Sequence, residues 1–201
     1  ALPIYHVVDV AFANLVGRHG HPQGADGTAC ETDFAIIGYG KLGGIELGYT
    51  SDLDLVFVHN ADPELATDGD KPIDNAVFYT RLGQRIVHIL NTQTPSGQLY
   101  EVDMRLRPSG NSGLLVSTLH AFEKYQREDA WTWEHQALAR ARGVAGCTET
   151  LEAFESIRHN ILCQKRDRDK LRQDVVEMRE KMRASLGTPE SRQAEVFHKS
   201  E

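Results

Sequence analysis

Two β-strands joined by a glycine-rich segment are predicted in the first third of the sequence. The apolar run Phe34–Ile37 predicts a buried strand that ends at Gly38, and the alternating segment SDLDLVFV (51–58) predicts a second strand. Between them lies GYGKLGG, a turn in which the backbone can approach another group closely because glycine lacks Cβ. This strand–turn–strand unit is the centre of the predicted fold.

Helical patterns lie on both sides of this unit. Apolar residues recur at helical spacing over 4–18, and a second helix is predicted to begin at Pro72–Asp74 and to stop before Pro95. The segment QLYEVDMRLRP (98–108) alternates and predicts a third strand, followed by a turn at SGNSG. We expect one helix over 118–138, with Trp133 among its core residues, and a last long helix over about 167–186.

This element order predicts an α/β (α+β) fold, with a small mixed sheet, flanking helices and a helical C-terminal part. We expect a domain over 1–145 that includes the N-terminal helix, and further helices over 146–187 that pack on it. Residues 188–201 are expected to form an irregular tail. The chain starts without Met and inside an amphipathic pattern, which indicates a piece of something longer.

Asp52 and Asp54 are the candidate reactive groups on the second strand. Side chains alternate along a strand, so both carboxylates point to one face, roughly 6.5–7 Å apart at Cα. Two unpaired carboxylates this close repel each other, and a divalent cation such as Mg²⁺ removes the conflict. The alternative is that both aspartates merely cap the strand start, since a lone DxD motif is not specific.

The third predicted strand adds a carboxylate and two guanidiniums on one face. Glu101, Asp103, Arg105 and Arg107 point one way in this alternation, opposite an apolar face. A third metal carboxylate at Asp103, beside phosphate-binding Arg105 and Arg107, would satisfy these charges. A salt-bridged edge strand is the alternative. The glycine-rich turn has neither the GK[ST] of a Walker A loop nor the long crossover helix of a dinucleotide fold, and its glycines alone indicate only a turn.

Together these residues resemble the nucleotidyltransferase superfamily that includes DNA polymerase beta and the aminoglycoside nucleotidyltransferases. That pattern has a Gly-Ser turn, two alternating acids about a dozen residues later on a strand, and a third acid on a later strand. The spacing from Gly40 to Asp52 matches it. Lys41 departs from the pattern, because it stands where many members have Ser.

Three longer stretches are similar to the bacterial glutamine synthetase adenylyltransferases. The resemblance covers about residues 34–142, and these enzymes carry two similar nucleotidyltransferase domains, one adding AMP to glutamine synthetase and one removing it. The motifs RPSG and AWTWEHQAL resemble those of the C-terminal, AMP-adding copy. The stretches are GYGKLGGIELGYTSDLDLVFV, LYEVDMRLRPSGNSGLLV and AWTWEHQALARAR.

The resemblance implies Mg²⁺-dependent transfer of AMP from ATP to a tyrosine hydroxyl of glutamine synthetase, in the regulation of nitrogen assimilation. It implies that Asp52 and Asp54 hold a nucleotide-bound Mg²⁺. It also implies that Asp103 helps to hold a second metal that activates the attacking hydroxyl, with direct uptake of the proton by Asp103 as a further option. Arg105 and Arg107 are expected to stabilise phosphate or pyrophosphate, from strand geometry as much as from the family. The expected phosphate contacts in the turn region are Gly40, Lys41, Gly43, Gly44 and Ser51.

The net charge and the composition of the chain limit the kinds of partner that it is expected to bind. The formal net charge of −7 disfavours a general nucleic-acid binder, because phosphate contacts need clustered Lys and Arg. Three separated cysteines without a CxxC pair, no signal peptide and no apolar run long enough for a bilayer favour a cytoplasmic protein without a membrane partner. The resemblance adds glutamine synthetase, a PII-type signalling protein and the remaining domains of the longer enzyme as partners.

Two other functions stay open at this point. The first is the related AMP-removing domain, which works by phosphorolysis on the same fold and metals. The second is a catalytically inactive module that senses nucleotide or docks regulators, which the intact set Asp52, Asp54 and Asp103 argues against.

Overall fold

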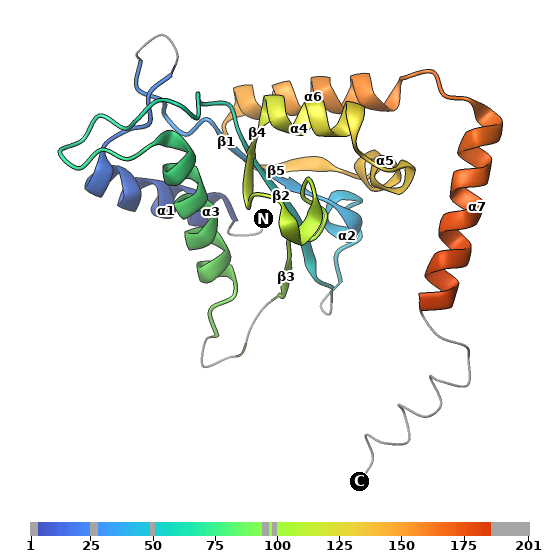
Figure 1. The fold of residues 1–201 in the computed structure, drawn as a ribbon. Helices are drawn as coiled ribbons and strands as arrows, with labels where there is room; N and C mark the ends of the chain where they lie inside the picture. The colour runs from blue at the N-terminus through green and yellow to red at the C-terminus, as the bar shows by residue number, and fades with distance from the viewer. Residues whose placement is uncertain (1–3, 25–27, 49–50, 94–96, 98–99, 186–201) are drawn as a thin grey trace. The chain divides into compact units, whose positions relative to one another are not determined.

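The computed structural model describes residues 4–24, 28–48, 51–93, 97 and 100–185 of the 201-residue chain. Within these residues it contains a five-stranded mixed sheet flanked by helices (Figure 1), so the predicted fold class is confirmed. The predicted tail over 188–201 lies outside the described residues. The strands are β1 (Phe34–Gly38), β2 (Leu53–His59), β3 (Val102–Asp103), β4 (Val116–Thr118) and β5 (Arg142–Gly146).

The sheet is built around β1 and β2, the two strands predicted from the apolar runs. They pair antiparallel, with Ile36 opposite Phe57, and β5 pairs antiparallel with the other side of β1. The outer edge of β2 is shared by two short parallel strands, β3 along its first residues and β4 along its last. The α-helices are α1 (Ile4–His19), α2 (Gly40–Gly43), α3 (Asn75–Leu90), α4 (Leu119–Glu128), α5 (Thr132–Ala139), α6 (Thr148–Leu162) and α7 (Arg168–Ser185).

Both faces of β2 are buried, because helices cover the sheet on two sides. Leu55 and Phe57 pack in one core with residues of α1 and α3, which lie side by side in Figure 1. Val56 and Val58 pack in a second core with residues of α4 and α6. The alternation that sorts these four residues therefore sends Asp54 to the face of the second core, near the start of the strand. Asp52 directly precedes β2, which begins at Leu53.

The described chain groups into two compact units. The first takes in the described residues up to 130 and those of 134–163, and the second takes in 131–133 and 164–185. α6 buries Phe154 and Ile161 in the second core of the first unit. The expected division at residue 145 stays a prediction. None of the helices among the described residues is long and apolar enough to cross a membrane.

The predicted strand over 98–108 is wrong beyond Asp103. The chain forms only β3 there, and residues 105–109 turn. The Asp103 carboxylate accepts a hydrogen bond from the backbone N–H of Arg105 at 2.8 Å, a local turn that competes with an extended ladder. Ser109 then takes a φ of 59° and Gly110 a φ of 54°, which reverses the chain into the short 3₁₀ turn Gly110–Ser112. Residues 98–99 of the predicted strand lie outside the described residues.

The single helix predicted over 118–138 is also wrong, because it is two helices. The Thr118 hydroxyl accepts from the Ala121 N–H at 3.0 Å and caps α4, which ends at Glu128 before α5 begins. Trp133 is not a core residue, since 40% of it is exposed. The strands β4 and β5 have no sequence prediction, because the three residues of β4 are too few to show a period and the RGVAG of β5 has no apolar run like that of β1.

His59, at the end of β2, should make the folded state sensitive to acid. Its ring is 3% exposed and stacks on Tyr79 with centroids 4.3 Å apart. Burial lowers the pKa of His59 from its ordinary 6.5 to about 4. Between these values the unfolded chain binds a proton that the folded chain rejects, so stability falls as pH drops from 6.5 towards 4. We expect a loss of up to about 3 kcal/mol in the free energy of unfolding.

Urea unfolding across pH 4–7 measures this effect. A His59→Phe variant keeps the stacked ring but has nothing to protonate, so its stability should vary less over this pH range than that of the wild type. His120→Gln, at an exposed position on α4, is the matched control and should keep the wild-type slope. An equal slope in wild type and His59→Phe would show that His59 does not carry the acid sensitivity.

Candidate active site

The glycine-rich turn begins directly beside Asp54. Gly38 pairs with Leu55 at the end of the β1–β2 ladder, and the next residue, Tyr39, donates its N–H to the Asp54 carbonyl at 2.9 Å. Gly40 follows with a φ of 51°, and a Cβ on it would lie 2.2 Å from Asp54 Oδ2. The backbone at Gly40 thus forms one wall of the Asp54 carboxylate, and only glycine leaves room for it.

Asp103 comes from a strand that pairs with β2 across a long stretch of chain. In the parallel β2–β3 ladder Asp54 is the register partner of Asp103, so both side chains leave the same face of the sheet on adjacent strands. Burial raises the pKa of Asp54, and the negative charges of Asp103 and then Asp52 raise it further. The three carboxylates predicted as one set therefore lie within electrostatic reach of each other.

Arg105 binds Asp103 in this structure. Its Nε donates to both carboxylate oxygens, at 3.0 and 2.8 Å, and its Nη2 donates to Oδ2 at 2.5 Å. These hydrogen bonds hold the pKa of the Asp103 carboxyl below its usual range. The pKa values of Asp54 and Asp103 are therefore shifted in opposite directions, because burial and then neighbouring carboxylates act on Asp54, whereas a guanidinium holds Asp103.

The carboxylates of Asp52, Asp54 and Asp103 suit a hard divalent cation, both by their chemistry and by their positions. Mg²⁺ prefers carboxylate oxygens, and the mutual repulsion that raises the Asp54 pKa is what such an ion would relieve. The absence of a Cβ at Gly40 lets the turn backbone lie against the Asp54 carboxylate. Among the described residues, however, no three His, Cys, Asp or Glu side chains are already arranged to hold a metal ion. Arg105 engages both oxygens of one of the three candidates, Asp103.

Lys41 and Ser51, two predicted phosphate contacts, both precede the Asp pair in sequence. Lys41 is exposed in α2, and its positive charge lowers the pKa of Asp54, which places its ammonium within reach of the same cluster. Ser51 is buried, and its Oγ accepts from the Gly48 N–H at 3.1 Å, which closes the loop before β2. Its hydroxyl proton is still free to be donated to another acceptor.

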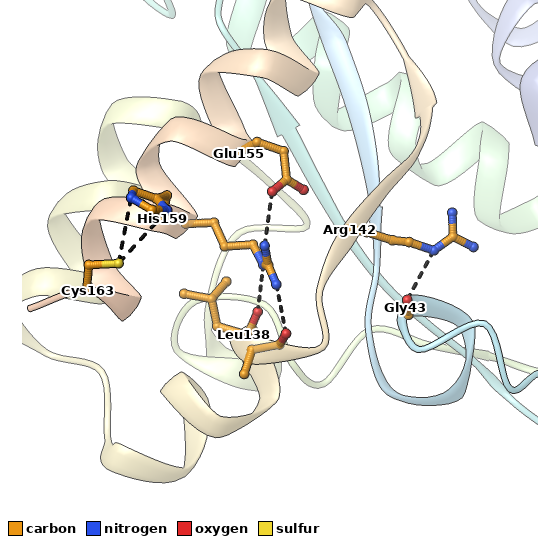
Figure 2. Close-up of polar contacts among 8 residues, drawn as sticks. Gly43, Leu138, Arg142, Glu155, His159 and Cys163 are labelled. Atoms are coloured by element: carbon orange, nitrogen blue, oxygen red, sulfur yellow. Dashed lines mark hydrogen bonds and ion pairs between the residues drawn. The ribbon is translucent and has the colours of Figure 1, made fainter.

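Close packing against Arg140 requires glycine at positions 43 and 44, apart from any contact with phosphate. A Cβ on Gly43 would lie 2.0 Å from the Arg140 carbonyl oxygen, and one on Gly44 would lie 2.4 Å from Arg140 Nη2. Arg142 donates to the Gly43 carbonyl at 3.1 Å (Figure 2) and to the Leu42 carbonyl at 3.2 Å. These contacts fasten the end of the turn to Arg140 and to the first residue of β5. Phosphate binding by the two glycines stays a prediction.

Arg107 also has structural partners. Its Nη1 donates to the Met104 carbonyl at 2.6 Å and its Nε approaches the Gly113 carbonyl at 3.5 Å, so it closes the RPSG loop on itself. Its charge still contributes to the lowered pKa of Asp103. A role for Arg107 at phosphate stays a prediction, since these described contacts are with loop carbonyls.

A half-buried hydrogen bond between α4 and α5 supports the RPSG loop, and sequence spacing did not reveal it. The Tyr125 hydroxyl on α4 donates to Glu134 Oε1 on α5 at 3.1 Å, and the Ser109 backbone hydrogen-bonds the same hydroxyl. Arg158 of α6 fixes the other end of α5, donating to the carbonyls of Leu138, at 3.0 Å, and Ala139, at 2.7 Å. Figure 2 shows the contact at the Leu138 carbonyl and, beside it, the Arg142–Gly43 bond. Because the partners are distant in sequence, only the tertiary structure shows which residues support the site.

Comparison with known proteins identifies the family of the chain. The sequence profile of the family described as "Glutamate-ammonia ligase adenylyltransferase" matches residues 2–157. The chain belongs to the glutamate-ammonia ligase adenylyltransferase family. The matched range includes all ten candidate site residues, the three aspartates and the seven phosphate contacts. The family resemblance predicted from the sequence is confirmed, and the enzyme class agrees with the family's description.

Relatives in this family are described as bifunctional glutamine synthetase adenylyltransferase/adenylyl-removing enzymes. One from Pseudomonas putida is 63% identical over 182 residues, which is 90% of this chain and 19% of the relative. One from Pseudomonas aeruginosa is 60% identical over 185 residues, 92% of this chain and 19% of the relative. One from Nitrosococcus oceani is 59% identical over 181 residues, 89% of this chain and 19% of the relative. The chain thus spans about a fifth of the length of these adenylyltransferase relatives.

Proposed function

We propose that this chain is the adenylyl-transferring unit of its family, which moves AMP from ATP to a tyrosine hydroxyl of glutamine synthetase and releases pyrophosphate. The observation that carries the proposal is the pairing of Asp54 with Asp103 on one sheet face, beside a turn whose backbone reaches the Asp54 carboxylate. A structural strand cap would not require the third acid or the glycine contact.

The roles of the residues follow from where they lie. Asp52, Asp54 and Asp103 would hold one or two divalent cations, Mg²⁺ for preference, which would supply charge neutralisation for the phosphates. Lys41 would reach the nucleotide's phosphates as a point charge, with Ser51 donating a hydrogen bond. Asp103 suits the role of metal ligand better than that of general base, because its lowered pKa keeps the carboxylate weakly basic.

The experiment uses the 201-residue chain with unmodified glutamine synthetase, Mg²⁺ and ATP labelled at the α-phosphate. We expect label on a glutamine synthetase tyrosine and equimolar pyrophosphate, and no label when Mg²⁺ is removed with a chelator. Label that never reaches glutamine synthetase, together with absence of ATP binding, would favour a docking module without catalysis.

AMP removal is the second candidate function, because the printed names of the relatives cover both directions. In that reaction phosphate attacks the adenylyl-tyrosine, so inorganic phosphate enters the site where pyrophosphate would otherwise leave. A parallel incubation with adenylylated glutamine synthetase and phosphate tests it. Release of ADP in this incubation, with no labelling in the first, would assign the chain to the removing direction. A PII-type regulator and the other domains of the longer protein are further proposed partners.

A further inference from the structure

Arg105 stands where a cation is needed in the carboxylate cluster. Its side chain makes three hydrogen bonds to Asp103, two from Nε and one from Nη2, and engages both oxygens. The charges of Asp54 and Asp52, as well as of Asp103, raise the pKa of Arg105. The guanidinium therefore offsets the negative charge of the whole set and not of one partner alone.

The two partners of this ion pair differ in freedom. Asp103 is fixed in β3 by its pairing with β2, and its side chain is 16% exposed. Arg105 follows the strand in a turn, and its side chain is 75% exposed. The guanidinium can move into solvent without disturbing either core, whereas the carboxylate stays in place.

We propose that Arg105 is a displaceable internal cation that holds Asp103 until a divalent metal takes its oxygens and then binds the nucleotide's phosphates. This inference rests on the proposed function. A metal and a guanidinium on the same two oxygens repel each other, so the metal must displace Arg105. The released guanidinium lies beside the metal cluster and is matched in geometry to phosphate oxygens.

The proposal predicts effects of opposite sign for one substitution. Without Arg105, a metal no longer competes for Asp103, so metal alone binds more tightly. The nucleotide, in turn, loses a phosphate partner and binds more weakly in the presence of metal. A loss of local structure would weaken metal binding and nucleotide binding alike. If the loss of a positive charge were the whole cause, removing another nearby cation would tighten metal binding equally.

Mn²⁺ titration followed by electron paramagnetic resonance measures metal binding to the nucleotide-free chain. Arg105→Gln should tighten Mn²⁺ binding by about tenfold, the size of a lost charge-assisted hydrogen-bond pair. In the presence of Mg²⁺, the same variant should bind α,β-methylene-ATP about tenfold more weakly by calorimetry. Arg105→Lys keeps the positive charge but lacks the planar guanidinium that engages both carboxylate oxygens, so its Mn²⁺ affinity should be intermediate.

Lys41→Gln is the charge-matched control, because Lys41 acts on Asp54 through its charge without a hydrogen bond to a carboxylate of the described residues. Equal tightening of Mn²⁺ binding in Arg105→Gln and Lys41→Gln, with nucleotide binding retained in wild type, would overturn the Arg105 inference and leave the proposed function standing. Wild type that binds neither Mn²⁺ nor α,β-methylene-ATP would overturn both.

Discussion

Replacing Asp54 by Asn should abolish AMP transfer while leaving the fold intact. Asp54 is the central carboxylate, with Asp52 two residues away, directly before β2, and Asp103 beside it on β3. An amide keeps the shape of the side chain but removes the charge that would hold the metal. We expect a loss of at least about 10³-fold in the rate of AMP transfer, the scale of losing a group that stabilises transition-state charge.

The same Asp54→Asn substitution should not lower the free energy of unfolding, although it abolishes transfer. Because burial and neighbouring charges raise the pKa of Asp54, its ionised form destabilises the metal-free fold as pH rises above the unfolded value. Asp54→Asn should therefore be at least as stable as wild type at neutral pH in chelator, by urea unfolding. Asp9→Asn, at an exposed position on α1, is the control and should leave transfer unchanged. Transfer by Asp54→Asn within tenfold of wild type would remove Asp54 from the site.

Replacing Gly40 by Ala should give the second largest effect. The new Cβ would lie 2.2 Å from Asp54 Oδ2, and the φ of 51° already disfavours any residue with a Cβ. Either the turn or the carboxylate must move, so the phosphate site and the metal site cannot both keep their geometry. We expect a loss of about 100-fold or more in AMP transfer, because a displacement of about 1 Å can cost this much.

The cost in stability should be smaller than the loss of activity. We expect about 1–3 kcal/mol by urea unfolding, from left-handed strain and the contact with Asp54. Gly17→Ala is the matched control, because a Cβ on this α1 glycine would meet nothing within 4 Å. That control should gain up to about 1 kcal/mol from helix propensity and keep full transfer. Full transfer by Gly40→Ala would mean that the Asp54 carboxylate does not work where this structure holds it.

The sequence alone predicted the strand that carries Asp54. Alternation in a strand is a local property, so SDLDLVFV was enough to predict one face for Asp52 and Asp54, and the structure begins β2 at Leu53, directly after Asp52. The apolar runs that became β1 and β2 were determined in the same way, as were α1, α3 and α7 within a few residues. Only the burial of β2 on both faces required the helices to be placed.

The tertiary structure decided what those carboxylates meet. The register that sets Asp103 beside Asp54 joins residues 49 positions apart in the numbering, and no local pattern encodes a pairing of that range. Arg105 was predicted to continue the alternation of a strand, yet the Asp103 side chain captured its backbone and guanidinium and ended the strand. The sequence thus supplied the charged groups, and long-range pairing decided which of them neutralise each other, because electrostatic contacts depend on distance in space and not on spacing along the chain.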